Sequence, residues 1–346
     1  MSSINHRKGL LQHLGIKHHE YWSWWLLVVP VWPLWIAYAF RLRCATWFTA
    51  VNPGMEDSGF FGESKIRILD SIPDAYKPRT LFIASGSSFD QACAQFRLSG
   101  IDFPCIVKPD IGGRGRKVEI IADENGLKTY HEGVGEDYLI QQLIPYDIEL
   151  GVFYIRMVNE EKGCVVSVAE KGFLQVTGND VSSIRQLMKN DYRASLQVAR
   201  LGKQLDLDQV PKAGERILLE PIGNHCRGTS FIDRHDLINE KLNKVFDVIA
   251  AQIPGFYYGR FDLRVKSLDD LYEGKNILIM ELNGLTSDAA HIFDPLSRLR
   301  DAYATQIRHC HLSYAIAKQN LKAGVKPTPL FELISKHGSR SGLNKD

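Results

Sequence analysis

Two stretches late in the chain place polar side chains on one face of otherwise apolar strands. In "YYGRFDLRV", polar and apolar residues alternate, so that Arg260 and Asp262 share one face of a strand. "KNILIMELNG" is an apolar run that ends in Glu281 and Asn283, which share a face because they lie two positions apart. If the two strands pair as a hairpin, these polar side chains meet on one face of the sheet.

The chemistry of this face is that of a divalent-cation site. Two carboxylates and an amide oxygen are hard ligands of the kind that Mg²⁺ or Mn²⁺ takes together with water and substrate phosphates. We therefore predict Asp262, Glu281 and Asn283 as metal ligands. The alternative is a polar strand face in contact with solvent. Against it, a buried strand rarely ends in polar residues that have no partner.

A second stretch, "FPCIVKPDIGGRGRKV", joins an apolar strand to a loop of glycines and basic residues. Lys108 ends the strand, and Gly112, Gly113 and Gly115 follow it. The spacing matches neither the P-loop pattern GxxxxGK[ST] nor the dinucleotide-binding pattern GxGxxG. A basic glycine loop beside a divalent-cation site still indicates a nucleoside triphosphate as the ligand.

In their order and separation, these motifs resemble the ATP-grasp superfamily, in particular the carboxylate–amine ligases that include D-alanine–D-alanine ligase and glutamyl ligases. The resemblance covers residues 103–295, with a fainter extension back to Lys65. It implies an α+β, ATP-grasp fold, in which two α+β lobes clasp ATP between antiparallel sheets. It also implies ATP and Mg²⁺ (or Mn²⁺) as cofactors.

The resemblance implies a role for each matching residue around the phosphates. Lys108 would touch the α- and β-phosphates, and Lys171, in "SVAEKGFLQVTG", would contact phosphate as well. Arg260 and Lys171 are implied to be catalytic, because both would offset negative charge on the reacting oxygens. The glycines are implied to form a mobile flap over the phosphates: Gly112, Gly113 and Gly115.

The stretch "YLIQQLIPYDIELGV" resembles the strand and hinge that join the two lobes. Gln141 stands where the family often has a glutamate that contacts the adenine amino group. Gln142, Leu143 and Ile144 are implied to form the hinge that faces adenine, and Glu149 is implied to bind the ribose hydroxyls.

The implied reaction has two steps: a carboxylate attacks the γ-phosphate of ATP, and an amine then displaces phosphate from the acyl phosphate. The stretch "FLQVTGNDVSSIRQLM" resembles ligases that act on glutamyl or peptide-like substrates, so D-alanine is not supported. Two alternatives stay open, a kinase-like phosphotransferase and a catalytically silent, membrane-bound ATP-binding scaffold. The complete set of matching lysines and metal ligands argues against the scaffold.

Other polar residues have two interpretations each. Arg156 interrupts "GVFYIRMV" and is either a clamp for a substrate carboxylate or a strand-edge arginine that reaches solvent. In "GNHCRGTSF", Asn224, His225 and Arg227 either line the acyl site or belong to a polar turn. His291 lies close to the metal strand, but a lone histidine is more often structural.

The elements that must position these residues mix strands and helices without a regular βαβ repeat. This pattern favours an α+β fold with antiparallel sheets. Strands are predicted at 80–84, 103–108, 117–121, 138–143, 149–158, 164–169, 216–220, 257–265 and 276–282. Helices are predicted at 63–69, 87–98, 181–189, 193–203, 233–252 and 297–320.

Composition narrows the class of protein. The net charge of +2 gives no reason to expect a nucleic-acid partner, which usually needs a concentrated basic surface. The six cysteines include no CxxC pair, which argues against a zinc knuckle or a disulfide framework and suits a reducing compartment.

All six tryptophans lie in the first 47 residues, in or beside the uncharged segment 21–40. About 20 apolar residues can cross a bilayer as a helix, and tryptophan and tyrosine favour the headgroup level. Pro30 and Pro33 would kink such a helix, so a bent membrane-associating segment is favoured over a straight crossing. The alternative is a hairpin of buried helices that caps the domain.

We therefore divide the chain into a membrane-associated segment 1–50, a short region 51–102, an ATP-grasp catalytic domain 103–322 and a polar tail 323–346. The stretch between the apolar segment and residue 103 is too short for the N-terminal domain typical of such ligases. We expect an enzyme attached to the cytoplasmic face of a membrane, acting on a small-molecule or lipid-linked carboxylate and amine.

Overall fold

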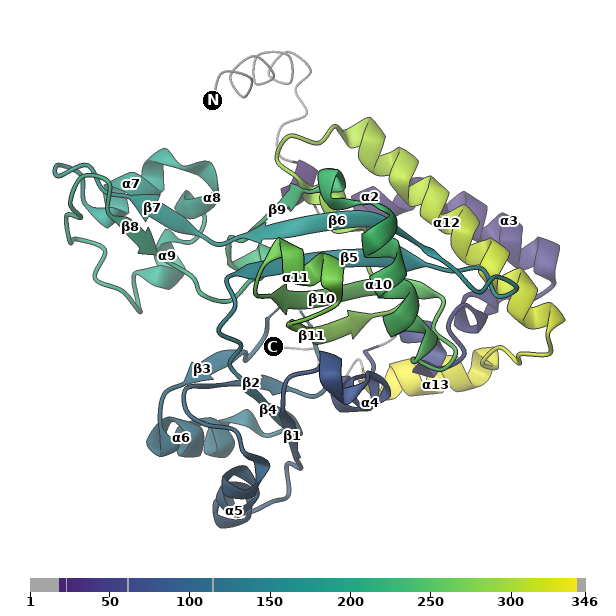
Figure 1. The fold of residues 1–346 in the computed structure, drawn as a ribbon, viewed down its shortest axis with the longest axis horizontal. Helices are drawn as coiled ribbons and strands as arrows, with labels where there is room; N and C mark the ends of the chain where they lie inside the picture. The colour runs from purple at the N-terminus through teal and green to yellow at the C-terminus, as the bar shows by residue number, and fades with distance from the viewer. Residues whose placement is uncertain (1–18, 23, 61, 114, 341–346) are drawn as a thin grey trace.

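Two antiparallel sheets form the centre of the molecule. The computed structural model describes residues 19–22, 24–60, 62–113 and 115–340. Figure 1 shows the smaller sheet below the larger one, with a separate small unit at the left. The α-helices are α2 (Trp24–Val28), α3 (Trp32–Leu42), α4 (Lys65–Ser71), α5 (Phe89–Ser99), α6 (Glu124–Val134), α7 (Ile184–Asn190), α8 (Tyr192–Ser195), α9 (Val198–Leu201), α10 (Glu240–Ala251), α11 (Leu268–Glu273), α12 (Leu299–Lys322) and α13 (Leu330–Arg340).

The first sheet has the strand order β1-β4-β2-β3 and is antiparallel throughout. Its strands are β1 (Thr80–Ile83), β2 (Cys105–Pro109), β3 (Glu119–Ile121) and β4 (Tyr138–Gln142). One face packs on α5 and α6 through a core that includes Val107, Leu127 and Ile140. β1 and α5 precede residue 103, so this lobe begins before the predicted start of the catalytic domain. The sequence also did not predict α6.

The second sheet has the order β11-β10-β5-β6-β9. Its strands are β5 (Ile148–Ile155), β6 (Cys164–Gly172), β9 (Ser230–Asp233), β10 (Tyr258–Val265) and β11 (Ile277–Asn283). Val152 and Phe261 point to one face and pack with the buried side of α10. On the opposite face, Phe153 and Tyr258 meet His309 of α12, while the other end of that face carries polar residues. The predicted α+β class with antiparallel sheets is confirmed.

A small unit is inserted between β6 and β9. It consists of the two-stranded sheet β7 (Gln175–Thr177) and β8 (Arg216–Leu218) with helices α7, α8 and α9. Its own core includes Met188, Leu201 and Leu219. The single helix predicted at 193–203 is two short helices, because the chain turns between Ser195 and Val198.

The apolar segment near the N-terminus folds as α2, a 3₁₀ turn at Val29–Val31, and α3. The predicted break at the prolines is confirmed. Tyr38 and Trp47 are buried in a core shared with Ile316 of α12, as the capping-hairpin alternative requires for one face of the segment. Among the described residues, no helix has the length and apolar character needed to cross a membrane.

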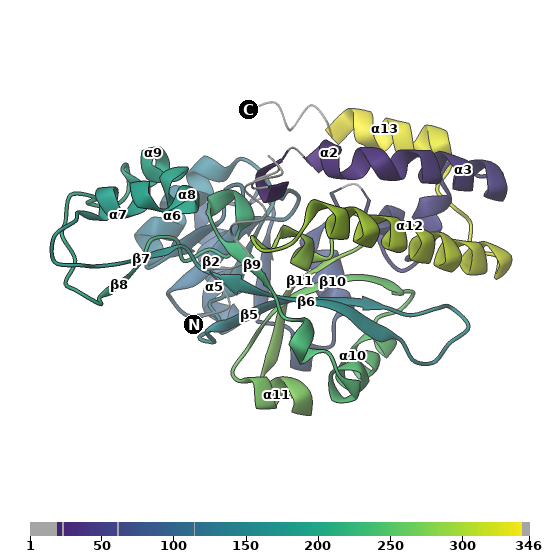
Figure 2. The same ribbon diagram turned by 90° about the horizontal axis from the view of Figure 1, so that it is seen from above.

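The C-terminal region differs from the predicted polar tail. α13 covers Leu330–Arg340, and Leu333 on it is buried. The linker before it is anchored, since the Thr328 hydroxyl donates to Asp57 at 2.7 Å. In Figure 2, α13 and the α2–α3 segment lie along the same upper edge of the molecule. Residues 330–340 thus form a helix that buries Leu333, because apolar residues are present in its first half.

Candidate active site

The predicted hairpin of β10 and β11 forms and gathers the polar residues as expected. Arg260 pairs with Asn283 and Asp262 pairs with Glu281 in the antiparallel ladder, so all four lie on one face. The connection between the strands contains α11. A β-bulge follows, because Leu263 pairs with Ile279 and leaves Met280 as the extra residue.

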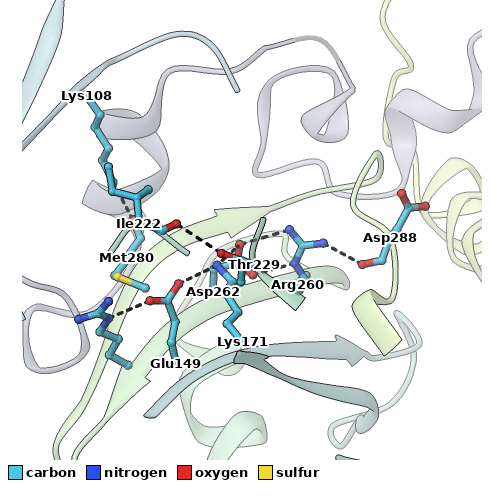
Figure 3. A network of polar contacts seen from close by, with 10 residues as sticks. Lys108, Glu149, Lys171, Ile222, Thr229, Arg260, Asp262, Met280 and Asp288 are labelled. Carbon is cyan, nitrogen blue, oxygen red and sulfur yellow. Dashed lines mark hydrogen bonds and ion pairs between the residues drawn. The ribbon is translucent and has the colours of Figure 1, made fainter. Parts of the chain in front are cut away.

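Buried ion pairs link three strands of the second sheet. Arg260 donates to Asp262 from Nε at 2.7 Å and from Nη2 at 3.2 Å, a bidentate pair. Lys171 on β6 donates to the Glu149 carboxylate at 2.8 Å and lies 3.9 Å from Asp262. Figure 3 shows these side chains converging from neighbouring strands. The two residues predicted to be catalytic, Arg260 and Lys171, therefore both lie beside Asp262.

Neighbouring charges shift the pKa values of the buried groups in this network. Burial alone would lower the pKa of Lys171, but the Glu149 and Asp262 carboxylates raise it above its ordinary value. Burial opposes ionisation of Asp262, yet Arg260 and Lys171 together lower the pKa of that carboxyl. Both groups are therefore ionised at neutral pH.

Glycines leave the room that this network needs. A Cβ at Gly151 on β5 would lie 3.2 Å from Arg260 Cδ and 3.4 Å from Asp262 Oδ1. A Cβ at Gly223 would lie 2.5 Å from Glu149 Oε1. Neither glycine has a side chain to signal its role in the sequence, and the sequence did not predict them.

Glu149 has a positioning role that the sequence did not predict. Its second oxygen accepts from Arg264 Nε at 2.8 Å, and the residue is only 4% exposed. Arg264 also donates to the Ile144 carbonyl at 3.2 Å, which ties the predicted hinge to β10. Contact between Glu149 and ribose hydroxyls stays a prediction, and it requires the carboxylate to be shared with Lys171 and Arg264.

Lys108 bridges the two sheets. Its Nζ donates to the Gln141 amide oxygen at 3.1 Å and to the Met280 carbonyl at 3.2 Å. The carbonyl is available because Met280 is the bulge residue of β11. Burial lowers the pKa of Lys108 to about 8, against the opposing effect of the Glu281 charge. The lysine thus links a strand of the first sheet to a strand of the second.

The predicted adenine-binding residues are only partly directed toward that space. The Gln141 amide oxygen is engaged by Lys108, and its amide nitrogen donates to Thr80 at 2.9 Å. Gln142 accepts from the Arg79 backbone at the edge of the first sheet. Leu143 and Ile144 follow directly and run into the second sheet. An adenine contact by Gln141 stays a prediction, in which the amide oxygen would accept from both Lys108 and the adenine amino group.

The glycine loop is tied down on both sides. Lys65, at the start of α4, donates to the Gly112 carbonyl at 2.6 Å and to the Asp110 carbonyl at 3.2 Å. Gly112 and Gly115 have φ values of 133° and 71°, which favour glycine. A Cβ at Gly113 would meet no other heavy atom within 4 Å. The faint match at Lys65 therefore corresponds to a residue in contact with the loop.

Basic residues of the loop do not all point toward the site. Arg116 pairs with both oxygens of Glu136 at 2.8 and 2.7 Å, and Lys117 reaches the same carboxylate at 3.0 Å. Arg114 lies outside the described residues. The Glu136 pairs hold the far side of the loop against the first lobe.

A second loop, residues 222–229, lies over the network and reaches the glycine loop. Arg227 Nη2 donates to the Gly115 carbonyl at 2.7 Å and to the Val118 carbonyl at 3.2 Å. Glu220, which is buried, binds Arg200 at 2.7 Å and lies 3.8 Å from Arg227. Arg227 thus contacts the glycine loop. The sequence had left two other interpretations open for this residue, an acyl-site residue and a residue of a polar turn.

His225 lies in an aromatic wall next to Lys171. Its ring stacks on Phe231 at 5.8 Å, and Phe293 lies 5.7 Å away. Phe231 is the ladder partner of Lys171. Burial lowers the pKa of His225 to about 4, so the imidazole is neutral at pH 7. Its Nε2 is buried and has no hydrogen-bond partner among the described residues.

Two other candidates lie away from the network. Arg156 follows the last residue of β5, seven residues from Glu149, or roughly 20 Å along a strand. Its guanidinium lies over the Tyr257 ring at 5.1 Å. His291 hydrogen-bonds Ser167 at 2.7 Å and Thr305 at 3.4 Å, which fits the structural interpretation.

The predicted ligands Asp262, Glu281 and Asn283 carry oxygen atoms of the kind that a hard divalent cation prefers. Only two of the three are carboxylates. Within the described ranges, no group of three or more His, Cys, Asp or Glu side chains could hold a metal. Asn283 Nδ2 is buried without a partner in that part of the chain, and no described residue pairs with the Glu281 carboxylate. Asp262 is shared with Arg260. The roles of Glu281, Asn283 and Asp262 as metal ligands stay a prediction, in which Asn283 would contribute its amide oxygen and Asp262 would be shared with Arg260.

A further carboxylate that the sequence did not predict, Glu63, lies near enough to Glu281 for the two charges to interact. Burial raises the pKa of Glu63, and the Glu281 charge acts in the same direction. The loop that carries Glu63 packs on β11, because the would-be Cβ of Gly59 lies 2.7 Å from both Glu63 Oε1 and Gly284 Cα. No spacing signal links residues so far apart in the chain.

Comparison with known proteins gives no match to any family model and none to any curated protein. Solved structures do match. A bifunctional glutathione synthetase from Pasteurella multocida is 17% identical, with 74% of this chain and 38% of that chain covered, at a TM-score of 0.39. D-alanine–D-alanine ligase from Bacillus anthracis is 17% identical, with 74% and 68% covered, at 0.40.

The N5-carboxyaminoimidazole ribonucleotide synthetase PurK, in complex with ADP, is 14% identical, with 75% of this chain and 54% of that chain covered, at a TM-score of 0.42. The chain thus spans little more than a third of the glutathione synthetase and about half of PurK. These are similarities of backbone at low identity, and the function proposed next rests on the side chains of the site.

Proposed function

We propose that the chain is an ATP-grasp carboxylate–amine ligase. The observation that carries the proposal is the buried network of Arg260, Asp262, Lys171 and Glu149, which faces Lys108 across the gap between two antiparallel sheets. Lys108 of the first sheet and Lys171 of the second lie near enough for their charges to interact, and Glu281 interacts with Lys108. Such an arrangement suits a polyphosphate and a divalent cation.

The proposed roles follow from position and charge. Lys108 and Lys171 bind phosphate oxygens, and Arg260 stabilises charge on the acyl phosphate as it forms and reacts. Glu281, Asn283 and Asp262 would hold Mg²⁺ or Mn²⁺, which neutralises charge on the β- and γ-phosphates when bound. Glu149 keeps Lys171 extended toward the site through their 2.8 Å ion pair.

The aromatic wall favours an acceptor with an apolar part. His225, Phe231 and Phe293 pack together beside Lys171, which is the ladder partner of Phe231. We place the substrate carboxylate between Lys171 and Arg260, with its apolar part against this wall. A small-molecule or lipid-linked acid fits this arrangement.

We also propose that the reaction takes place at a membrane surface on the cytoplasmic side. The support is the apolar segment 21–40, of which one face packs on α12 while residues of the other face are exposed. A lipid-linked substrate would then be held near the site by the same contact that holds the enzyme.

ADP release in the presence of Mg²⁺, screened over pairs of acids and amines with detergent-solubilised protein, tests the proposal. A ligase requires both an acid and an amine. Asp262→Asn should lower turnover by roughly 10²–10³-fold, as removal of one preorganised charge does in other enzymes. Asp269→Asn, an exposed carboxylate on α11, is the matched control and should leave turnover unchanged.

Other outcomes identify the alternatives. ADP release that needs one acceptor and no amine would indicate a phosphotransferase. ATP binding without ADP release, whatever the acceptor, would indicate a scaffold. Equal turnover by the parent and the Asp262→Asn variant would remove the proposed site.

A further inference from the structure

Two helices from opposite ends of the chain expose large apolar side chains to solvent. Phe40 on α3 is 80% exposed and Phe331 on α13 is 84% exposed. We define the α3/α13 face by its exposed large apolar residues: Val29, Trp32, Ile36, Phe40, Leu330, Phe331 and Ile334. Scattered exposed apolar residues are common on proteins, but a concentration of this kind marks an interaction surface.

The spacing of these residues shows that the exposure is organised. Trp32, Ile36 and Phe40 follow one another at intervals of four and therefore form one stripe along α3. Tyr38 points inward instead and stacks on Tyr314 of α12 at 3.8 Å. On α13, Leu333 is buried between exposed neighbours. Each helix thus packs one face against the core and exposes a second apolar face to solvent.

The two helices are fixed relative to each other. Thr328, just before α13, donates its backbone N–H to Thr49 at 2.9 Å. Lys336 on α13 lies 3.5 Å from Glu56 and 3.9 Å from Asp57. Figure 2 shows α3 and α13 along one edge of the molecule, with the rest of the fold below them. The face is therefore a preformed surface and not a pair of independent tails.

Positive charge borders this surface. Arg41 is exposed at the end of α3, and between Tyr21 and Met55 the sequence contains two arginines and no carboxylate. Next to Tyr314, a hollow of about 590 Å³ is lined by Lys318 and Lys322, and no carboxylate is among its described lining residues. Basic residues beside an apolar face complement anionic lipid headgroups.

A bilayer in contact with this face would meet the helices lying flat, because they are too short to span it. α3 has 11 residues, so it is about 16 Å long, roughly half the thickness of the hydrocarbon core. Trp32 is of a residue type that prefers the interface between headgroups and acyl chains, and Phe40 and Phe331 are apolar side chains that can be buried just below it. On the α3 side the border carries Arg41 and Arg43 without a carboxylate, which favours anionic lipid over a protein partner. On α13 the exposed Glu332 is paired with Lys336 at 2.9 Å.

We propose that the α3/α13 face docks flat on an anionic bilayer surface, with α13 supplying half of the contact. The inference deepens the membrane-surface part of the proposed function by naming its docking elements. Its test is a binding measurement without ATP, so that failure of the ligase chemistry and failure of the docking surface are distinguishable.

Flotation of the full chain with vesicles of equal parts phosphatidylcholine and phosphatidylglycerol is the measurement. The parent should float with these vesicles and much less with phosphatidylcholine alone. Phe40→Glu and Phe331→Glu should each weaken binding by about tenfold or more, because full burial of a phenylalanine contributes at least that factor. Both side chains are almost fully exposed, so the fold should tolerate the changes.

Leu98→Glu is the matched control, since Leu98 is 88% exposed on α5 of the other lobe. It should float as the parent does. Two results would overturn the proposal: unchanged flotation of the Phe40→Glu and Phe331→Glu variants, or equal loss with Leu98→Glu. A lipid-free dimer in analytical ultracentrifugation that Phe331→Glu disrupts would assign the face to a second copy of the chain instead.

Discussion

At the scale of single residues, the site depends on opposite effects of burial on two lysines. Lys171 is buried beside two carboxylates, which raise its pKa and keep it charged. Lys108 is buried with an amide and a carbonyl as its hydrogen-bond partners, and burial lowers its pKa to about 8. The two proposed phosphate contacts should therefore respond differently to pH.

We predict that ATP affinity falls as pH rises from about 7 to about 9.5, because Lys108 loses its charge in this range. Isothermal titration at a series of pH values measures this. Lys108→Arg stays charged and should bind ATP with a much flatter pH dependence. An equally steep decline in that variant would contradict the assignment of the effect to Lys108.

The lowered pKa of Lys108 also affects the stability of the protein. ATP affinity should fall as pH rises, whereas the stability of the ATP-free protein should gain from the same pKa shift. Between pH 8 and 10.5 the unfolded chain holds a proton on this lysine that the folded protein has lost. The free energy of unfolding of the ATP-free protein therefore contains a Lys108 contribution that rises with pH in this window. Denaturant titrations of the parent and Lys108→Arg at matched pH values compare the two.

At the scale of elements, the glycine loop and the 222–229 loop close over the site from different lobes. Arg227 makes the contact, with hydrogen bonds to the Gly115 and Val118 carbonyls across 112 and 109 residues of sequence. Its own position depends on Glu220 and on Arg200 of α9, which donates to the Arg227 carbonyl at 3.4 Å. The small inserted unit is thus coupled to the flap.

We predict that Arg227→Ala frees the glycine loop. Each hydrogen bond from a charged donor contributes about 1.5–3 kcal/mol, so loop opening should increase by roughly tenfold or more. Limited trypsin digestion reports this, because cleavage at Arg116 and Lys117 requires an open loop. Arg185→Ala is the control, since Arg185 pairs with Asp208 on the inserted unit and does not contact the loop. Equal cleavage rates in both variants would show that the Arg227 hydrogen bonds do not hold the glycine loop closed.

At the scale of the whole molecule, the N-terminal segment is part of the core as well as part of the surface. Trp47 is 1% exposed and packs with Trp35 and Tyr38, whereas Trp32 is 51% exposed on the α3/α13 face. Trp47 thus belongs to the core, whereas Trp32 belongs to the exposed surface. Removing the segment would expose α12 and is not equivalent to removing an anchor.

We predict a large difference between two tryptophan substitutions. Trp47→Ala should lower the free energy of unfolding by about 3–5 kcal/mol, because it leaves a cavity in the core. Trp32→Ala should change it by about 0.5 kcal/mol or less in the absence of lipid. Urea denaturation of the full chain measures both. Similar losses for the two variants would show that the segment does not pack as described.

Local sequence determined the strands that carry the site. Strict alternation in β10 separates Arg260 and Asp262 from Phe261, because successive side chains on a strand point to opposite faces. The apolar run of β11 and its polar end predicted the pairing that the ladder confirms. The break at Pro30 and Pro33 was likewise predictable, since proline lacks the donor that a helix needs.

Tertiary structure alone decided the contacts between distant segments. The bulge that frees the Met280 carbonyl for Lys108, the reach of Arg227 to Gly115, and the burial of Leu333 leave no periodic signal. The α13 helix and the edge that it shares with α3 depend on anchors at Thr328 and Lys336. Alternation and turn chemistry are local properties that a sequence displays directly. Which faces meet is set by packing across the whole chain. Only the folded molecule therefore shows the contact of Arg227 with the glycine loop and the exposed α3/α13 face.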